Sequence, residues 1–182
     1  MTCGRGGHRL LALGALIALA GCGSTKTATS VGHARTAPEL RVGQSAVLSG
    51  ETAGEALKVT LLAFSPNLSG GPNDHPEFDM QYVQADLRLT NVGSVVYRGA
   101  PRESVTVYTN EGTKSRRALL SEGPCADVFA REVEIAPGAS AQGCVPVQIA
   151  VVASATRLRF AVGRWDGRAA AGAAEWSLAR RR

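Results

Sequence analysis

The sequence predicts an all-β protein whose folded part is a β-sandwich of about seven to eight strands. Three observations support this prediction. Residues 82–91 alternate apolar and polar side chains without interruption, which is the pattern of a strand with one buried face. Further short alternating segments, separated by turn-forming residues, continue to about residue 178. No segment has a convincing helical period of apolar residues.

Residues 82–91 are expected to form the central strand. Val83, Ala85, Leu87 and Leu89 would share its buried face, and polar side chains would occupy the other. Because such a strand needs neighbours on both edges and a second sheet over its apolar face, we interpret residues 39–178 as one domain built around it.

The other strands are expected on both sides of this segment. The loop at residues 67–78 and the turn Asn91-Val92-Gly93 flank the central strand, whereas the Ala-rich residues 169–174 fit no clear pattern. The remaining alternating or apolar runs are residues 42–48, 57–64, 95–98, 103–109, 133–135, 145–151, 158–162 and 175–178.

Residues 1–21 have the layout of a secretory signal. Positive charges at Arg5 and Arg9 precede an uncharged apolar run over residues 10–20. That run is shorter than the roughly 20 apolar residues that a transmembrane helix needs. Small residues close it, as expected for a segment that is removed on export.

The end of this segment, Leu19-Ala20-Gly21-Cys22, resembles the lipobox of bacterial lipoproteins. The resemblance implies cleavage before Cys22 and attachment of a diacylglycerol to its thiol. Two acyl chains suffice for stable attachment to a bilayer, which would place the protein on the extracytoplasmic face of the cell membrane. A plain signal peptide followed by a chance cysteine is the alternative.

Residues 22–38 are expected to be a flexible tether. They are rich in Ser, Thr, Ala and Gly, and a coil of this length spans roughly 20 Å. Five of the 20 basic residues lie in the leader and in the tail at residues 179–182, leaving 15 to balance the 15 acidic ones. Because the body is neutral and shows no basic stretch with interleaved aromatics, nucleic acid is not an expected partner.

Two cysteines, Cys125 and Cys144, remain in the body once Cys3 is removed with the leader and Cys22 is acylated. In an exported chain such a pair is expected to form a disulfide. The bond would close a loop of about 20 residues and contribute roughly 3 kcal/mol on the chain-entropy account. A redox or metal pair is disfavoured because there is no C-x-x-C motif and no nearby histidine.

Four short segments carry a resemblance to a known family. They are residues 40–44 (Leu-Arg-Val-Gly-Gln), 58–61 (Lys-Val-Thr-Leu), 82–93 and 135–138 (Ile-Ala-Pro-Gly). Together they resemble the telokin-like extracellular domain, which has an immunoglobulin-like fold and is common in lipoproteins and secreted proteins of Gram-positive bacteria. The resemblance covers about residues 40–162. It implies an immunoglobulin-like sandwich and no catalytic residues, because the family has none in common.

Catalytic chemistry is not expected. Ser140 lies in the segment nearest to a G-x-S-x-G motif, but Gln142 replaces the second glycine and the segment is a turn between strands. The body and tether hold only His33 and His75 as possible bases. Glu132 and Glu134 are interpreted as solubilising charges. No enzyme activity and no cofactor are therefore predicted.

The candidate metal ligands are Asp74, His75, Glu77 and Asp79, in the loop before the central strand. Their spacing matches no standard metal motif, so a solvated loop is favoured over a cation site.

Two functions remain. One is a membrane-tethered interaction module that contacts another envelope protein or cell-wall material through loops or a sheet edge. The alternative is a carrier or sensor of a small molecule or cation that uses the loop at residues 67–79.

Overall fold

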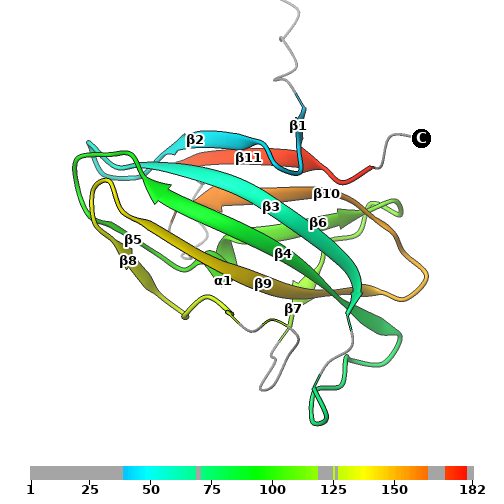
Figure 1. The fold of residues 1–182 in the computed structure, drawn as a ribbon. Helices are drawn as coiled ribbons and strands as arrows, with labels where there is room; N and C mark the ends of the chain where they lie inside the picture. The colour runs from blue at the N-terminus through cyan, green and yellow to red at the C-terminus, as the bar shows by residue number, and fades with distance from the viewer. Residues whose placement is uncertain (1–38, 69–70, 119–124, 126, 164–170, 180–182) are drawn as a thin grey trace, which may run out of the picture. The chain divides into compact units, whose positions relative to one another are not determined.

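The computed structural model describes residues 39–68, 71–118, 125, 127–163 and 171–179, and these are nearly all β (Figure 1). The expected signal, lipobox, Cys22, tether and terminal arginines (180–182) lie outside the described residues. No helix in the described part is long and apolar enough to cross a membrane. The elements are β1 (Leu40–Arg41), β2 (Ser45–Ser49), β3 (Ala56–Leu68), β4 (Met80–Asn91), β5 (Tyr97–Gly99), α1 (Pro101–Ser104), β6 (Val105–Thr109), β7 (Arg116–Arg117), β8 (Val133–Ile135), β9 (Ser140–Ala150), β10 (Ala155–Val162) and β11 (Gly172–Ser177).

The strands form two larger sheets and one small one. One larger sheet has the order β2-β3-β4-β9-β7, the other β1-β11-β10-β6, and β5 pairs with β8. Figure 1 shows the two larger sheets as facing layers. The predicted all-β sandwich is therefore confirmed. The strand count is higher than expected because β1 and β7 have only two residues each, too few for any pattern of alternation to reveal.

The central strand β4 has the predicted position and orientation. It pairs with β3 on one edge and with β9 on the other, antiparallel in both cases. Val83, Ala85, Leu87 and Leu89 are each at most 1% exposed, which confirms the face predicted to be buried. Because the strand is covered on both edges and on its apolar face, it holds the centre of the core.

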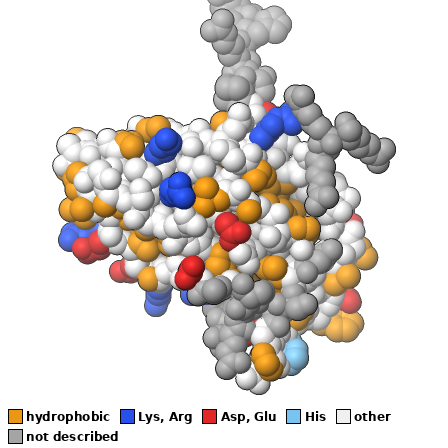
Figure 2. All heavy atoms as spheres, viewed as in Figure 1, with side chains coloured by type: hydrophobic (Ala, Val, Ile, Leu, Met, Phe, Trp, Pro, Cys, Tyr) orange, Lys and Arg blue, Asp and Glu red, His pale blue; other side chains and the backbone are white. Residues whose placement is uncertain are grey.

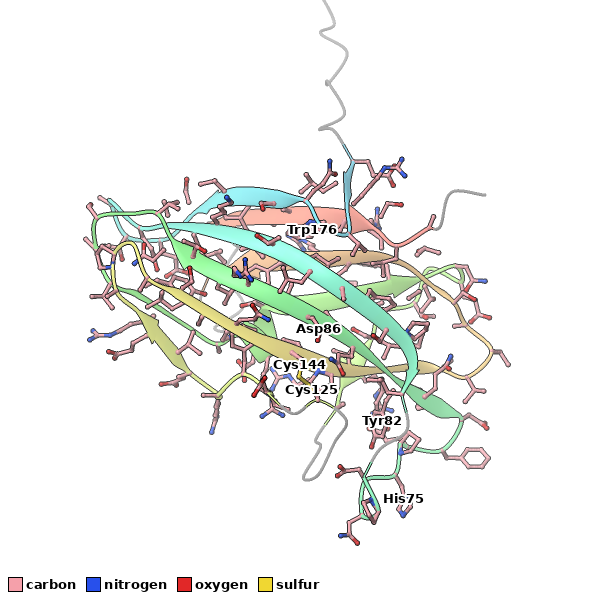
Figure 3. The ribbon with its side chains drawn as sticks, viewed as in Figure 1. His75, Tyr82, Asp86, Cys125, Cys144 and Trp176 are labelled. Carbon is pink, nitrogen blue, oxygen red and sulfur yellow. A yellow bond between two sulfur atoms is a disulfide. The ribbon has the colours of Figure 1, made fainter. Side chains whose placement is uncertain are left out.

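The core is formed by apolar side chains from both sheets. Leu57, Val59 and Leu61 of β3 pack in one cluster with Leu158 and Phe160 of β10. Trp176 of β11 is fully buried in the same cluster, and its indole N–H donates to the Gln44 carbonyl at 3.0 Å (Figure 3). That bond satisfies the one polar group of the largest core side chain.

Strand β9 is buried on both faces from residue 143 to residue 149. A disulfide joins Cys144 of this strand to Cys125, with 6.1 Å between the Cα atoms and a sequence separation of 19 (Figure 3). Beside it, the Cys144 N–H donates to the Asp127 carbonyl and the Phe129 N–H donates to the Cys144 carbonyl. The cysteines expected to pair thus fix the segment before β8 over the outer face of β9.

Several strand boundaries differ from the expectations, among them the starts of β2, β9 and β11, and three of the differences have a local reason. Residues 101–104 form the helical turn α1 where a strand was expected from residue 103, because Pro101 has the φ of a first helical residue. β3 continues through Pro66 to Leu68, since its β2 partner ends opposite Thr60 and leaves a free edge that tolerates proline. β9 ends at Ala150, so Val151 lies in a turn and is 56% exposed.

Asn91, the last residue of β4, joins three segments. Its side chain is fully buried, and its amide donates to the carbonyls of Val95 and Ile135 at 2.8 Å each. Its side-chain oxygen accepts from the Gly93 N–H at 2.9 Å. Every polar atom of this side chain is therefore bonded, and the turn after β4 is held against β8.

Candidate functional site

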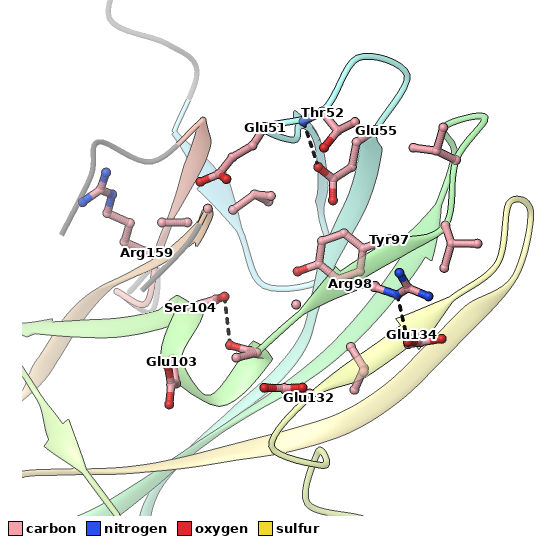
Figure 4. Close-up of a pocket in the computed structure, with 18 residues that line it drawn as sticks. Glu51, Thr52, Glu55, Tyr97, Arg98, Glu103, Ser104, Glu132, Glu134 and Arg159 are labelled. Atoms are coloured by element: carbon pink, nitrogen blue, oxygen red, sulfur yellow. Dashed lines mark hydrogen bonds and ion pairs between the residues drawn. The ribbon is translucent and has the colours of Figure 1, made fainter. Parts of the chain in front are cut away.

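An open cleft of about 960 Å³ lies at the end of the sandwich that carries the small β5–β8 sheet. The β2–β3 turn, β5, α1, the start of β8 and the end of β10 supply its walls (Figure 4). This volume is at the upper end of the range for small-molecule sites, about 300–1,000 Å³. The lining contains five glutamates and two arginines, which are Glu51, Glu55, Glu103, Glu132, Glu134, Arg98 and Arg159.

The β2–β3 turn places Glu55 at the cleft. Its carboxylate folds back over Gly50, where a Cβ would overlap it, and accepts the Thr52 N–H at 3.3 Å. Gly54 has a φ of +84°, a conformation that favours glycine. The two glycines thus let the turn close tightly, and Figure 4 shows the Glu55 carboxylate directed toward Tyr97.

Tyr97 of β5 forms the floor of the cleft. The residue is 2% exposed, its ring belongs to the hydrophobic core, and its hydroxyl points into the cleft (Figure 4). A Cβ at Gly99, two residues later in β5, would overlap that hydroxyl. The absence of a side chain at Gly99 therefore leaves the space that the Tyr97 hydroxyl occupies. Burial, together with the Glu55 carboxylate, raises the pKa of Tyr97 to about 12. The phenol is therefore neutral at physiological pH.

Several charged groups of the lining already have partners. The Arg98 guanidinium contacts Glu134 at 2.8 Å, and Arg117 contacts Glu103 at 3.4 Å. Figure 4 shows the guanidiniums of Arg98 and Arg159 directed away from Tyr97. The positive charges thus lie at the periphery of the cleft.

The hydroxyl of Ser104 donates to the Ala100 carbonyl at 3.1 Å within α1. This serine side chain is held by its own helical turn. Ser140, the serine nearest to a catalytic motif in the sequence, lies at the start of β9 and shares a hydrogen bond of 2.8 Å with Thr90. Both hydroxyls therefore have structural partners.

The four candidate metal ligands lie in the loop before β4, away from β5 and β8 (Figures 1 and 3). Asp74 is 6% exposed, whereas His75, Glu77 and Asp79 are exposed. Glu77 pairs with Arg116, and its N–H donates to the Gln148 side chain at 2.8 Å. No group of three or more His, Cys, Asp or Glu that could hold a metal ion is found among the described residues. The loop does not gather its four candidates into a ligand set.

Charges of both signs are scattered over the face shown in Figure 2, with hydrophobic side chains between them. The most exposed large apolar residues are Phe78 at 92% and Val152 at 81%. Their two loops are joined by a hydrogen bond of 2.9 Å from the Val151 N–H to the Asp79 carbonyl. Phe78 and the β9–β10 turn thus form an apolar loop tip.

Sequence reasoning missed the cleft. Glu132 and Glu134 were interpreted as solubilising charges, but Glu134 binds Arg98 and both residues line the cleft. The lining comes from separate segments that only the fold brings together. One local signal was present: Tyr97 and Gly99, two residues apart on a strand, share a face, and glycine leaves space for the phenol.

No family model and no curated protein matches this chain. Solved structures do. The chain is similar to MPT63, a secreted protein from Mycobacterium tuberculosis, with a TM-score of 0.54, 13% identity and coverage of 75% of this chain and 94% of that one. It is also similar to YcdA of Bacillus subtilis, described as a candidate lipoprotein, with a TM-score of 0.54, 11% identity and coverage of 76% of this chain. The matched part spans 39% of YcdA. At these identities the likeness shows a shared fold.

Proposed function

We propose that this chain is an extracytoplasmic lipoprotein, held on the cell membrane by acylated Cys22, and that its sandwich is a non-catalytic binding module of the telokin-like, immunoglobulin-like type. The charged and apolar leader before Cys22 supports the anchor. The Cys125–Cys144 disulfide suits an oxidising compartment outside the cytoplasm. The two similar solved structures are those of a secreted protein and a candidate lipoprotein, which agrees with a location outside the cytoplasm.

One observation carries the binding role: the cleft has a polar floor group, the Tyr97 hydroxyl, on a rigid core residue. A binding group that lies on a strand, with its side chain packed in the hydrophobic core, is already held in position before a ligand arrives. The residues that line the cleft include no histidine or cysteine, and the Ser104 hydroxyl is held by Ala100. Binding without chemistry is therefore the simplest use of the cleft.

The apolar loop tip favours a second role, contact with another envelope protein or with cell-wall material. Phe78 is 92% exposed, and a large aromatic side chain on a loop is the kind of residue that anchors a protein interface. In this role the tether would hold the tip within reach of neighbouring surface molecules.

The anchor is tested with Cys22→Ser in cells that are fed labelled palmitate. The native chain should incorporate label and partition into detergent, whereas the variant should do neither and should appear in the medium. Labelling of the Cys22→Ser variant would contradict the assignment of this cysteine.

The two binding roles are separated by cross-linking in intact cells followed by mass spectrometry, with Cys22→Ser as the released control. Phe78→Ser should abolish a protein cross-link that depends on the loop tip, while leaving the cleft unchanged. A cross-linked partner that survives Phe78→Ser would refute the loop-tip contact.

A further inference from the structure

The Tyr97 hydroxyl is the polar group at the floor of the cleft, and no hydrogen bond joins it to another described residue. The residue as a whole is 2% exposed. Among the described residues no fully buried side-chain nitrogen or oxygen lacks a partner, so this hydroxyl reaches the open space of the cleft. Asn91, at the other end of the same turn, shows how this fold bonds a polar group that is enclosed. The phenol therefore has one hydrogen-bonding position open to a ligand in the cleft.

The charge around that position is negative. Glu55 is directed toward Tyr97, and among the described residues its carboxylate accepts only the Thr52 N–H. Glu132 is exposed at the opposite wall and has no ion-pair partner in the described part of the chain. Of the two arginines in the lining, Arg98 is held by Glu134, and Figure 4 shows the Arg159 guanidinium directed away from Tyr97. A cleft lined in this way attracts cations and disfavours anions.

We propose that the cleft binds a small molecule that carries a primary ammonium group, placed between the Tyr97 hydroxyl and the Glu55 carboxylate. An ammonium group has three N–H donors and no acceptor. The neutral phenol can accept one of these hydrogen bonds, and the carboxylate can accept another with opposite charge. The inference rests on the proposed role of the cleft as a binding site and names the chemistry of its ligand.

An organic cation fits this lining better than a metal ion. Calcium takes six to eight oxygen ligands and zinc about four ligands in fixed geometry, whereas an ammonium group needs only two or three acceptors. The described residues present no group of three or more metal-ligating side chains. A volume of about 960 Å³ leaves room for a chain or ring behind the ammonium group.

The test uses the full-length protein in detergent and isothermal titration with three matched probes: 1,4-diaminobutane, neutral 1,4-butanediol and anionic succinate. Diaminobutane should bind, and the other two should not. Tyr97→Phe and Glu55→Gln should each weaken diaminobutane binding by about tenfold, the usual loss for one hydrogen bond to a charged group. Tyr108→Phe and Glu175→Gln, which change residues outside the cleft lining, should bind diaminobutane as the native protein does.

The outcomes separate the two proposals. If butanediol or succinate binds and diaminobutane does not, the cleft is a binding site but the ammonium assignment is wrong. If none of the three binds, both the cleft's binding role and this inference fail. Diaminobutane binding that Tyr97→Phe and Glu55→Gln leave unchanged would place the cation elsewhere and refute the proposal.

The ammonium group could come from a free amine or from a lysine side chain. Nα-acetyl-lysine methylamide, titrated in the same way, distinguishes these sources. If it binds as tightly as diaminobutane, the cleft takes a lysine side chain of a peptide. If it binds at least tenfold more weakly, the ligand is a free amine. Circular dichroism of each variant checks that the sandwich is intact.

Discussion

Replacement of Asn91 by alanine should destabilise the sandwich more than any other change to a single polar side chain in the turn after β4. The substitution removes three hydrogen bonds, two to the carbonyls of Val95 and Ile135 and one from the Gly93 N–H. A net contribution of about 1 kcal/mol per bond, together with the cost of leaving buried groups without a partner, gives a loss of about 2–4 kcal/mol.

The assay is urea unfolding of the Cys22→Ser protein, monitored by circular dichroism, with thermal unfolding as a second measure. For a domain of this size about 1 kcal/mol shifts Tm by roughly 2–4 °C, so a loss of about 2–4 kcal/mol in Asn91→Ala should lower Tm by about 4–16 °C. Asn91→Asp, which places an acceptor against two carbonyls, should cost at least as much.

The matched control is Thr90→Val, one residue earlier in the same strand. It keeps the β-branched shape and removes one exposed hydrogen bond, to Ser140, so the loss should be under about 1 kcal/mol. If Asn91→Ala costs no more than Thr90→Val, or if Asn91→Asp is tolerated, the reasoning that this side chain joins the turn to β8 is wrong.

Three further predictions concern the disulfide and the cleft floor. Replacing Cys125 and Cys144 together by serine should lower the free energy of unfolding in urea by about 3 kcal/mol, because the bond closes a loop between cysteines with a sequence separation of 19. An unchanged urea midpoint would contradict this expectation. Because the pKa of Tyr97 is raised to about 12 from 10.0, the folded protein keeps the phenolic proton that the unfolded chain loses. The contribution of this proton to the free energy of unfolding should therefore be fully present below pH 10.0 and should be lost between pH 10.0 and about 12, by at most about 3 kcal/mol. In urea titrations at each pH, Tyr97→Phe should lack this loss of stability. Gly99→Ala places a Cβ over the Tyr97 hydroxyl and should abolish diaminobutane binding in calorimetry, while Gly112→Ala, a glycine with open space around it, should not.

The sequence predicts the strands whose own side chains alternate. β4 is the clearest case, and β10 follows the same rule with Leu158 and Phe160 buried. The two-residue strands β1 and β7 escape prediction because tertiary pairing alone defines them. The proline of α1 was visible at position 101, but the valines that follow it favoured a strand.

The candidate site was predicted less well than the fold. The loop before β4 is a candidate metal site in the sequence because its charged residues are close together along the chain. In the structure, however, Glu77 forms an ion pair with Arg116 and Asp74 is buried. The cleft, in contrast, joins Glu55, Tyr97 and Glu132 from three separate segments. Their proximity depends on how the β2–β3 turn and the β5–β8 pair close the end of the sandwich, which no local pattern encodes.

The short first strand also determines how the domain bears a mechanical load. β1 runs parallel to β11, so tension applied from the N-terminal side enters at Leu40 and acts along the strands, in shear. The pairing joins only two residues of each strand. The next fixed points are Gly43, whose N–H donates to the Leu61 carbonyl at 2.7 Å, and Gln44, whose carbonyl accepts from the buried Trp176 indole. A pull that detaches residues 40–44 would release at most about 17 Å of extended chain before it reaches β2. The apolar core and the cleft would stay intact during that extension, so β1 would act as a sacrificial segment at the N-terminal edge of the folded domain.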